Sequence, residues 1–208
     1  GKLNIDKTGE IIKLSKASII GLNEVDSRML RSNFQNQLKI LSEKLDMNYV
    51  YGPTLDMFIG SYGNGILTKF PVKKIKNHKL PGTPGFEPRG LLEAEILLSS
   101  SFKLNVLVTH LSLEKEERIR QWEWILNYID SKKGPFILMG DFNFEQNSSE
   151  LKYFLATDKT YPSVNPVKEI DMFFSDSLKK DRVYTIKSSA SDHLPLVIEL
   201  KYAESKSI

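Results

Sequence analysis

The chain contains no cysteine, which excludes disulfide bonds, thiolate nucleophiles and cysteine-bound zinc. Any bound metal must therefore be held by oxygen atoms or by one of the three histidines. No apolar run approaches membrane-spanning length, and the opening stretch GKLNIDKTGE lacks the apolar segment of a signal peptide. Neither sign of charge dominates: 29 Lys and Arg face 26 Asp and Glu, and a net charge of +3 does not by itself indicate nucleic-acid binding. These absences favour a soluble protein, slightly favour the cytoplasm, and leave secretion and oligomeric state open.

The length and the hydrophobic pattern predict one α/β domain spanning residues 1–208. Apolar residues at helical spacing predict a helix over residues 5–16 and a longer one over 27–46. The buried face of the longer helix would carry Leu30, Phe34, Leu38, Leu41 and Leu45. Ser112 is expected to cap a third helix, whose buried side would carry Ile119, Trp122, Leu126 and Ile129. A further helix is expected over 149–156, and short apolar runs between the helices predict strands.

Polar residues gather at the ends of these apolar runs. They are Glu24, His110, Asp141 with Asn143, Asp171, and Asp192 with His193. Strand ends and their loops are where a rigid scaffold brings distant parts of a sequence together. Several carboxylates with two imidazoles suit a hard divalent cation and phosphate chemistry.

Each of these residues also has a plainer interpretation. Asp141 and Asn143 in GDFN could form an Asx turn, and Glu24 could be a solvated loop acid. His110 could be a satisfied histidine at a strand end, whereas Asp171 at the head of an aromatic strand needs a buried partner. An ordinary α/β domain with accidental motifs predicts that these side chains do not converge in space.

Seven segments occur in the order and near the spacing of one known superfamily. They are IIGLNEVD, GNGIL, THLSL, MGDFN, TYPSVNP, EIDMFF and SDHLPL. The sequence from about Ile19 to Leu200 resembles the endonuclease/exonuclease/phosphatase superfamily, whose fold is that of deoxyribonuclease I. The resemblance implies a four-layer α/β sandwich, in which two packed sheets of mixed and antiparallel strands are flanked by helices. It also implies a metal-dependent phosphoesterase site at one edge of the sandwich.

The resemblance implies a role for each matching residue. Glu24 is similar to the metal-binding glutamate and Asp192 to a second acidic metal ligand, with Mg²⁺ or Mn²⁺ as the expected cofactor. His193 resembles the histidine that contacts the scissile phosphoryl group, and Asp171 its carboxylate partner. Asp141 resembles the residue that orients or deprotonates the attacking water.

The remaining matches imply contacts with substrate. Asn143 is expected to donate a hydrogen bond to phosphate, and His110 to bind phosphate or assist the leaving oxygen. Arg89 stands where relatives often have an arginine, and a salt bridge is as good an interpretation as a phosphate contact. Asn64 matches the GN of the strand motif and is expected near substrate.

Two departures from the family pattern stand out. The family's sheet begins with a strand carrying T-x-N or similar, and this chain opens at Gly1 without it, so the domain is expected to be N-terminally incomplete and to leave a strand edge unpaired. Asn23 also replaces the glutamine that usually precedes the metal-binding glutamate.

The sequence leads to two hypotheses about function. The first is a divalent-metal-dependent hydrolase that cleaves a phosphoester, with a phosphodiester as the favoured substrate, by in-line attack of an activated water. Its substrate is left open among nucleic acid, a phospholipid headgroup and an inositol phosphate, with no obligate protein partner. The alternative is a catalytically weak or inactive phosphate-binding module of the same fold.

Overall fold

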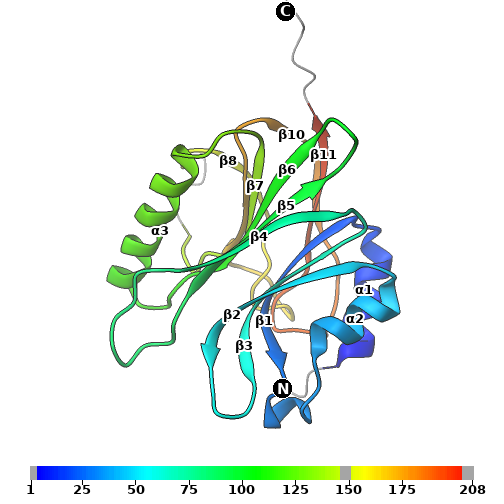
Figure 1. Cartoon of the computed structure of the whole chain (residues 1–208), viewed down its shortest axis with the longest axis vertical. Coiled ribbons are helices and arrows are strands. Elements are labelled where there is room, and N and C mark those ends of the chain that lie inside the picture. The colour runs from blue at the N-terminus through cyan, green and yellow to red at the C-terminus, as the bar shows by residue number, and fades with distance from the viewer. Residues whose placement is uncertain (1–3, 146–150, 203–208) are drawn as a thin grey trace, which may run out of the picture.

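The computed structural model describes residues 4–145 and 151–202 (Figure 1). Its elements follow the chain as α1 (Ile5–Ser15), β1 (Ile19–Ser27), the 3-10 helix η1 (Leu30–Ser32), α2 (Gln37–Leu45), β2 (Asn48–Asp56), β3 (Ser61–Thr68), β4 (Val72–Lys79), β5 (Gly90–Leu97), β6 (Lys103–His110), α3 (Lys115–Asp130), β7 (Phe136–Asp141), β8 (Phe154–Thr157), β9 (Asp171–Phe174), β10 (Leu178–Thr185) and β11 (Leu196–Tyr202). No helix in the described ranges is long and apolar enough to cross a membrane.

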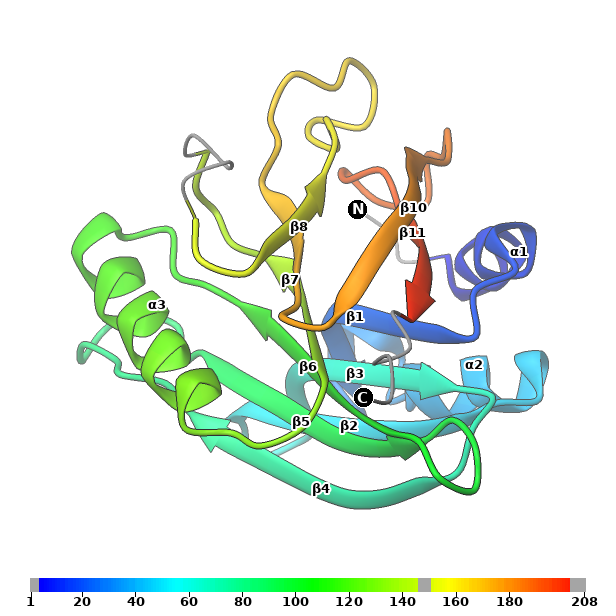
Figure 2. The same ribbon diagram turned by 90° about the horizontal axis from the view of Figure 1, so that it is seen from above.

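The strands form two layers. One layer is a six-stranded sheet in the order β4-β5-β6-β7-β9-β8, in which β6 and β7 are parallel and the other neighbours antiparallel. The other layer consists of a three-stranded sheet, β1-β3-β2, and a two-stranded sheet, β10-β11. Helix α3 lies outside the first layer, and α1 and α2 lie outside the second (Figure 2). The expected four-layer α/β sandwich is confirmed.

Three hydrophobic clusters hold these layers together. The largest lies between the two strand layers, and Val50, Ile66, Leu92 and Val106 belong to it. A second packs the six-stranded sheet against α3, and a third packs the three-stranded sheet against α1 and α2. The six-stranded sheet is thus largely apolar on both faces, and the polar residues at its strand ends lie at its edge.

Strand register brings the polar strand ends together. The parallel pairing of β6 with β7 places His110 opposite Asp141, and the antiparallel pairing of β7 with β9 places Asp141 opposite Asp171. In the facing layer, the pairing of β1 with β3 is interrupted between Leu22 and Val25. Glu24 sits in this bulge with φ +58, a conformation that turns its side chain out of the regular alternation.

The second layer is divided into two separate sheets. Within the described ranges, β1 pairs with β3 alone, and β10 and β11 pair only with each other. Residues of β1 and β11, including Ile19, Leu196 and Ile198, are only partly buried against the central core. This edge of β1 is therefore an unpaired strand edge, as the family pattern led us to expect.

The expected helix over residues 27–46 is wrong in its first half. The α-helix begins at Gln37, after Asn36, whose side chain accepts a hydrogen bond from the backbone of Lys39. Asn33 and Phe34 have positive φ angles of 52° and 58°, which end the preceding turn and cannot continue a right-handed helix. Leu30 and Phe34 are consequently exposed, whereas they were predicted to be buried.

Three smaller expectations also fail. Glu114 is the N-cap residue of α3, and Ser112 instead accepts a hydrogen bond from the Glu114 backbone through its hydroxyl. Ile119 is exposed, because the buried side of α3 runs through Glu117, Gln121 and Ile125. The expected helix over 149–156 is wrong for residues 154–156, which lie in β8. Pairing with β9 overrides the local helical spacing there. Residues 149–150 lie outside the described residues.

Candidate active site

The carboxylate of Asp141 lies between two imidazoles. Its Oδ2 atom is 3.6 Å from Nε2 of His110 and 3.7 Å from Nε2 of His193. His110 ends β6 and Asp141 ends β7, while His193 comes from the loop before β11. Three segments that are far apart in the sequence therefore converge on one oxygen atom, which excludes the interpretation that the motifs are accidental.

His193 is held by an acid on its other ring nitrogen. Nδ1 of His193 lies 2.8 Å from Oδ2 of Asp171, and because a carboxylate only accepts, Nδ1 carries the proton. The Thr160 hydroxyl donates to the same Asp171 oxygen, and the Tyr161 ring packs against the imidazole at 4.9 Å. Burial alone lowers the pKa of His193, but the hydrogen bond and charge of Asp171, together with Asp141, raise it to about 9. This imidazole is a cation at neutral pH.

His110 is neutral, whereas His193 is charged. Nη1 of Arg89 lies 3.0 Å from Nδ1 of His110, and because a guanidinium only donates, Nδ1 is the acceptor and the proton sits on Nε2. Burial, followed by the charges of Arg89 and His193, lowers the pKa of His110 to about 3. His110 is thus a neutral donor that presents its N–H toward Asp141.

Asp141 is a poorly compensated acid. Burial and the nearby charge of Asp171 raise its pKa to about 7, against the opposing effect of His193. Its Oδ1 accepts a hydrogen bond from the Asn143 backbone at 2.8 Å, which is the Asx turn that was the plainer interpretation of GDFN. The turn and the site coexist, because the turn uses Oδ1 and leaves Oδ2 facing the imidazoles.

Two asparagines tie the strands around this cluster. Asn23 donates to Oδ1 of Asn64 at 2.8 Å and to the carbonyl of Thr109 at 2.9 Å, and it accepts from the backbone N–H of Asp141 at 3.2 Å. Asn64 in turn donates to the carbonyl of Gly90 at 3.0 Å. Asn23, which departs from the family's glutamine, therefore links both strand layers, and the side chain of Asn64 already has partners at both polar ends.

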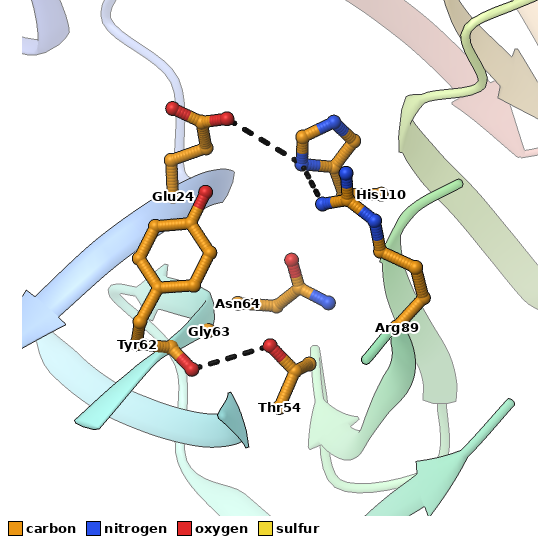
Figure 3. A pocket seen from close by; sticks show the side chains of 7 residues that line it. All are labelled: Glu24, Thr54, Tyr62, Gly63, Asn64, Arg89 and His110. Atoms are coloured by element: carbon orange, nitrogen blue, oxygen red, sulfur yellow. Dashed lines mark hydrogen bonds and ion pairs between the residues drawn. The ribbon is translucent and has the colours of Figure 1, made fainter. Parts of the chain in front are cut away.

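Glu24 faces this cluster from the other layer. Its Oε1 atom lies 3.9 Å from Nδ1 of His110, and its side chain is 63% exposed. Figure 3 shows Glu24, Tyr62, Arg89 and His110 around one pocket, with the Tyr62 hydroxyl directed toward the Glu24 carboxylate. Burial, then the charge of Glu24, raises the pKa of Tyr62 and keeps it a neutral donor. Accessible carboxylate oxygens of this kind fit a divalent cation.

The other expected residues lie nearby in different settings. Arg89 is buried and forms an ion pair with Glu87 at 2.9 Å, in keeping with the salt-bridge interpretation. Asn143 donates through Nδ2 to the carbonyl of Leu111 at 2.9 Å. Asp192 is exposed, and its Oδ1 accepts from the Ser191 hydroxyl at 3.2 Å. Its charge helps to raise the pKa of His193, so it lies beside the cluster.

Two residues of the site were not predicted from the sequence. Thr160 is fully buried and binds Asp171, and Tyr62 lines the pocket beside Glu24. Thr160 opens the quoted segment TYPSVNP, whose position before Asp171 was a usable signal. Tyr62 precedes GNGIL in an ordinary strand pattern and carried no such signal.

Asp141, Asp171 and His193 also form a compact group of possible metal ligands. One ligand atom from each lies within 4.8 Å of the others. In the metal-free site the two carboxylates raise the pKa of His193 to about 9, so a metal binding at Nε2 would have to displace a proton. The group therefore combines two carboxylates with an imidazole whose Nδ1 atom Asp171 already engages.

The family model described as Endonuclease/Exonuclease/phosphatase family matches residues 2–193. The chain belongs to this family. Family members are hydrolytic phosphoesterases that generally use divalent metals. Among curated proteins, the uncharacterized protein YbhP of Escherichia coli strain K12 is 26% identical over 185 residues, covering 78% of this chain and 72% of the relative.

Solved structures of the family show the same fold. A family protein from Beutenbergia cavernae superposes with a TM-score of 0.77 at 19% identity, covering 97% of this chain and 67% of that one. A mannosyl-6-phosphatase from Bacteroides thetaiotaomicron gives 0.76 at 18% identity, covering 95% and 90%. The human Nocturnin catalytic domain gives 0.71 at 18% identity, covering 96% and 86%.

Proposed function

We propose that the protein is a divalent-metal-dependent hydrolase that cleaves phosphoester bonds by in-line attack of an activated water. The observation that carries the proposal is the position of Oδ2 of Asp141 between the Nε2 atoms of a neutral His110 and a cationic His193. An acid, a neutral imidazole and a cationic imidazole are the groups that water activation and phosphoryl charge stabilisation require.

Asp141 is assigned the role of general base. A base works best when its pKa lies near the operating pH, and Asp141 meets this condition with a pKa of about 7. The Asn143 backbone fixes Oδ1, so the free Oδ2 is the atom that accepts the proton of the attacking water. The proton passes from water to this oxygen as the new P–O bond forms, the P–O bond to the leaving group breaks, and the leaving oxygen takes a proton from solvent.

His193 and His110 are assigned to the phosphate. The Nε2–H of His193 is cationic and fixed by Asp171, so it stabilises negative charge on the phosphoryl oxygens. His110 presents a neutral N–H donor fixed by Arg89, suited to binding phosphate or the leaving oxygen. Asn143 uses one of its two amide hydrogens on the carbonyl of Leu111 and retains the other for phosphate.

Glu24 and Asp192 are assigned to the divalent cation, Mg²⁺ or Mn²⁺. Both carboxylates are exposed, and oxygen ligands of this kind suit hard divalent cations. When bound, such a cation neutralises charge that grows on the phosphoryl and leaving oxygens.

The proposal is tested by hydrolysis of an aryl phosphodiester and an aryl phosphomonoester with Mg²⁺, with Mn²⁺ and with chelator. We expect turnover that requires metal and that is lost in His193→Ala. The exposed Asp176 offers a matched control in Asp176→Asn, which should behave as the wild type. Turnover retained by a folded His193→Ala protein would refute the site.

The alternative is the phosphate-binding module, and the unpaired edge of β1 is the observation that favours it. Calorimetric titration with Mg²⁺ and inorganic phosphate separates the two hypotheses. Metal-dependent phosphate binding without turnover of either aryl ester would support the module, and turnover would exclude it.

A further inference from the structure

Exposed apolar side chains are concentrated on the loops around the candidate active site. Five of them form what we call the hairpin-tip patch: Leu30, Phe34, Met57, Phe58 and Ile59. Other exposed apolar residues lie on loops that lead directly into site residues: Phe86 before Arg89, Leu113 after His110, and Val164 and Val167 before Asp171. Such a concentration at one edge of a molecule marks an interaction surface.

The two segments that carry the hairpin-tip patch lie side by side at their bases. Met57 to Ile59 form the tip between β2 and β3, and Leu30 and Phe34 lie in the turn that follows β1. The two segments are in contact, because Gly60 packs so closely on the backbone of Arg28 that an added Cβ would come within 2.5 Å of it. Figure 1 shows both segments extending from the same end of the molecule.

We propose that the hairpin-tip patch inserts into a phospholipid surface, and that the phosphoester cleaved at the site is a lipid headgroup ester. This inference rests on the proposed function for its second part. Phe58 is fully exposed at the extreme tip, and Met57 and Ile59 flank it. A side chain of this kind is stabilised when it enters the apolar boundary of a lipid layer.

The distance between tip and site supports this orientation. Glu24 lies at the level of Gly63 to Gly65 on the neighbouring strand, and the tip begins at Ile59, four to six residues further along. At about 3.3 Å per residue, the tip lies roughly 13 to 20 Å beyond Glu24. Interfacial insertion reaches about 5–10 Å, so an inserted tip brings the site close to the headgroup phosphates.

The chemistry of the patch favours lipid over nucleic acid. Single-stranded nucleic acid needs a basic track with aromatic platforms, whereas three of the five patch residues are aliphatic: Leu30, Met57 and Ile59. The exposed lysines of β4 belong to an edge strand, where lysine prevents unwanted strand pairing. Arg28 is exposed beside the patch and complements a lipid phosphate.

The test is sedimentation with sucrose-loaded vesicles of phosphatidylcholine and phosphatidylglycerol at four to one. We expect the wild type to sediment with the vesicles, and Phe58→Ser to lower the partition coefficient about tenfold. Ile75→Ser is the matched control, because Ile75 is an exposed apolar residue on β4 that lies outside the patch. Both variants should hydrolyse a soluble aryl phosphodiester at the wild-type rate.

Several outcomes would overturn the inference. One is a wild type that stays in the supernatant, and another is an equal loss of vesicle binding in Phe58→Ser and Ile75→Ser. A third is Phe58-dependent binding to a single-stranded oligonucleotide, or to a second copy of the chain, in place of vesicles. Hydrolysis of the soluble ester without vesicle binding would overturn the lipid inference and leave the proposed function standing. Phe58-dependent vesicle binding without any hydrolysis would support the docking surface and overturn the phosphoesterase.

Discussion

Two buried polar clusters lie on the six-stranded sheet, and they differ in how their carboxylates are compensated. Asp141 lies at the edge, where its pKa is raised to about 7. Glu93 lies on the face of β5 that α3 covers. Burial acts to raise the pKa of Glu93, but the hydrogen bonds from Lys132 and Tyr128 have a larger effect, and the pKa is lowered. His78 lies 3.5 Å from the same carboxylate. Both clusters join an acid to a histidine, but only Glu93 has a cation and a hydroxyl bound directly to it.

The difference separates a structural cluster from a reactive one. A buried acid with a bound cation has its charge neutralised and contributes to the fold. An acid whose pKa lies near neutral pH, and which has one carboxylate oxygen without a hydrogen-bond partner, can accept a proton from a substrate. The comparison therefore predicts that substitutions in the two clusters have opposite effects on activity and stability.

Asp141→Asn should have the largest effect on turnover. The amide keeps the shape of the side chain but cannot accept the proton of the attacking water, so kcat should fall by about 10²- to 10⁴-fold. Stability should equal or exceed that of the wild type, because the substitution removes a buried acid whose ionised form the fold disfavours. Steady-state hydrolysis of the aryl phosphodiester and urea unfolding measure the two quantities, and a kcat within threefold of the wild type would contradict the assignment.

Glu93→Gln should have the reverse profile. It leaves Lys132 buried without its counter-charge, and breaking such a pair typically costs about 3 kcal/mol of unfolding free energy. The value of kcat should be unchanged, because no residue of the Glu93 cluster touches the site. Glu116→Gln, at an exposed position on α3, is the matched control for loss of a negative charge. A large fall in kcat for a folded Glu93→Gln protein would break the comparison.

Thr160→Val should lower kcat by about tenfold, because it removes the hydroxyl that donates to the Asp171 oxygen holding His193. Thr157→Val is the matched control, since the Thr157 hydroxyl donates to the backbone carbonyl of Asp171 at 2.7 Å and leaves the carboxylate alone. Stopped assays across pH compare the two variants. Equal kcat values in both would show that Thr160 has no role in positioning His193.

The pH dependence of the unfolding free energy should also differ between the two clusters, and this effect should be smaller than those of the substitutions above. The folded pKa of Asp141 is raised, so its favourable contribution is present below its unfolded pKa of about 3.8 and is lost as pH rises toward 7. The folded pKa of Glu93 is lowered, so its contribution is present above about 4.5 and is lost as pH falls. As pH rises from 4 to 6 with chelator present, the unfolding free energy of the wild type should fall relative to that of Asp141→Asn. A constant difference across this range would contradict the raised pKa.

The sequence predicted the site better than the segments around it. Asp141, His110 and Asp171 end or begin apolar strands, and strand pairing alone brings such residues together. The protonation states were beyond the sequence, because they depend on which neighbour each ring nitrogen meets: Arg89 for His110 and Asp171 for His193.

Local spacing failed where tertiary structure overrode it. Leu30 and Phe34 have helical spacing, but the positive φ of Asn33 and Phe34 turns the chain and leaves both side chains exposed. Phe154 and Ala156 pair with β9 because a strand edge was available there. Neither the turn nor the free edge is encoded in hydrophobic periodicity.

The most direct test of the central claim measures kcat and unfolding free energy side by side for Asp141→Asn and Glu93→Gln, with Mg²⁺ present in the assay. The account predicts that Asp141→Asn loses turnover and keeps its stability, while Glu93→Gln loses about 3 kcal/mol of stability and keeps its turnover. It would be contradicted if Asp141→Asn retained wild-type turnover, or if the two variants lost activity and stability together.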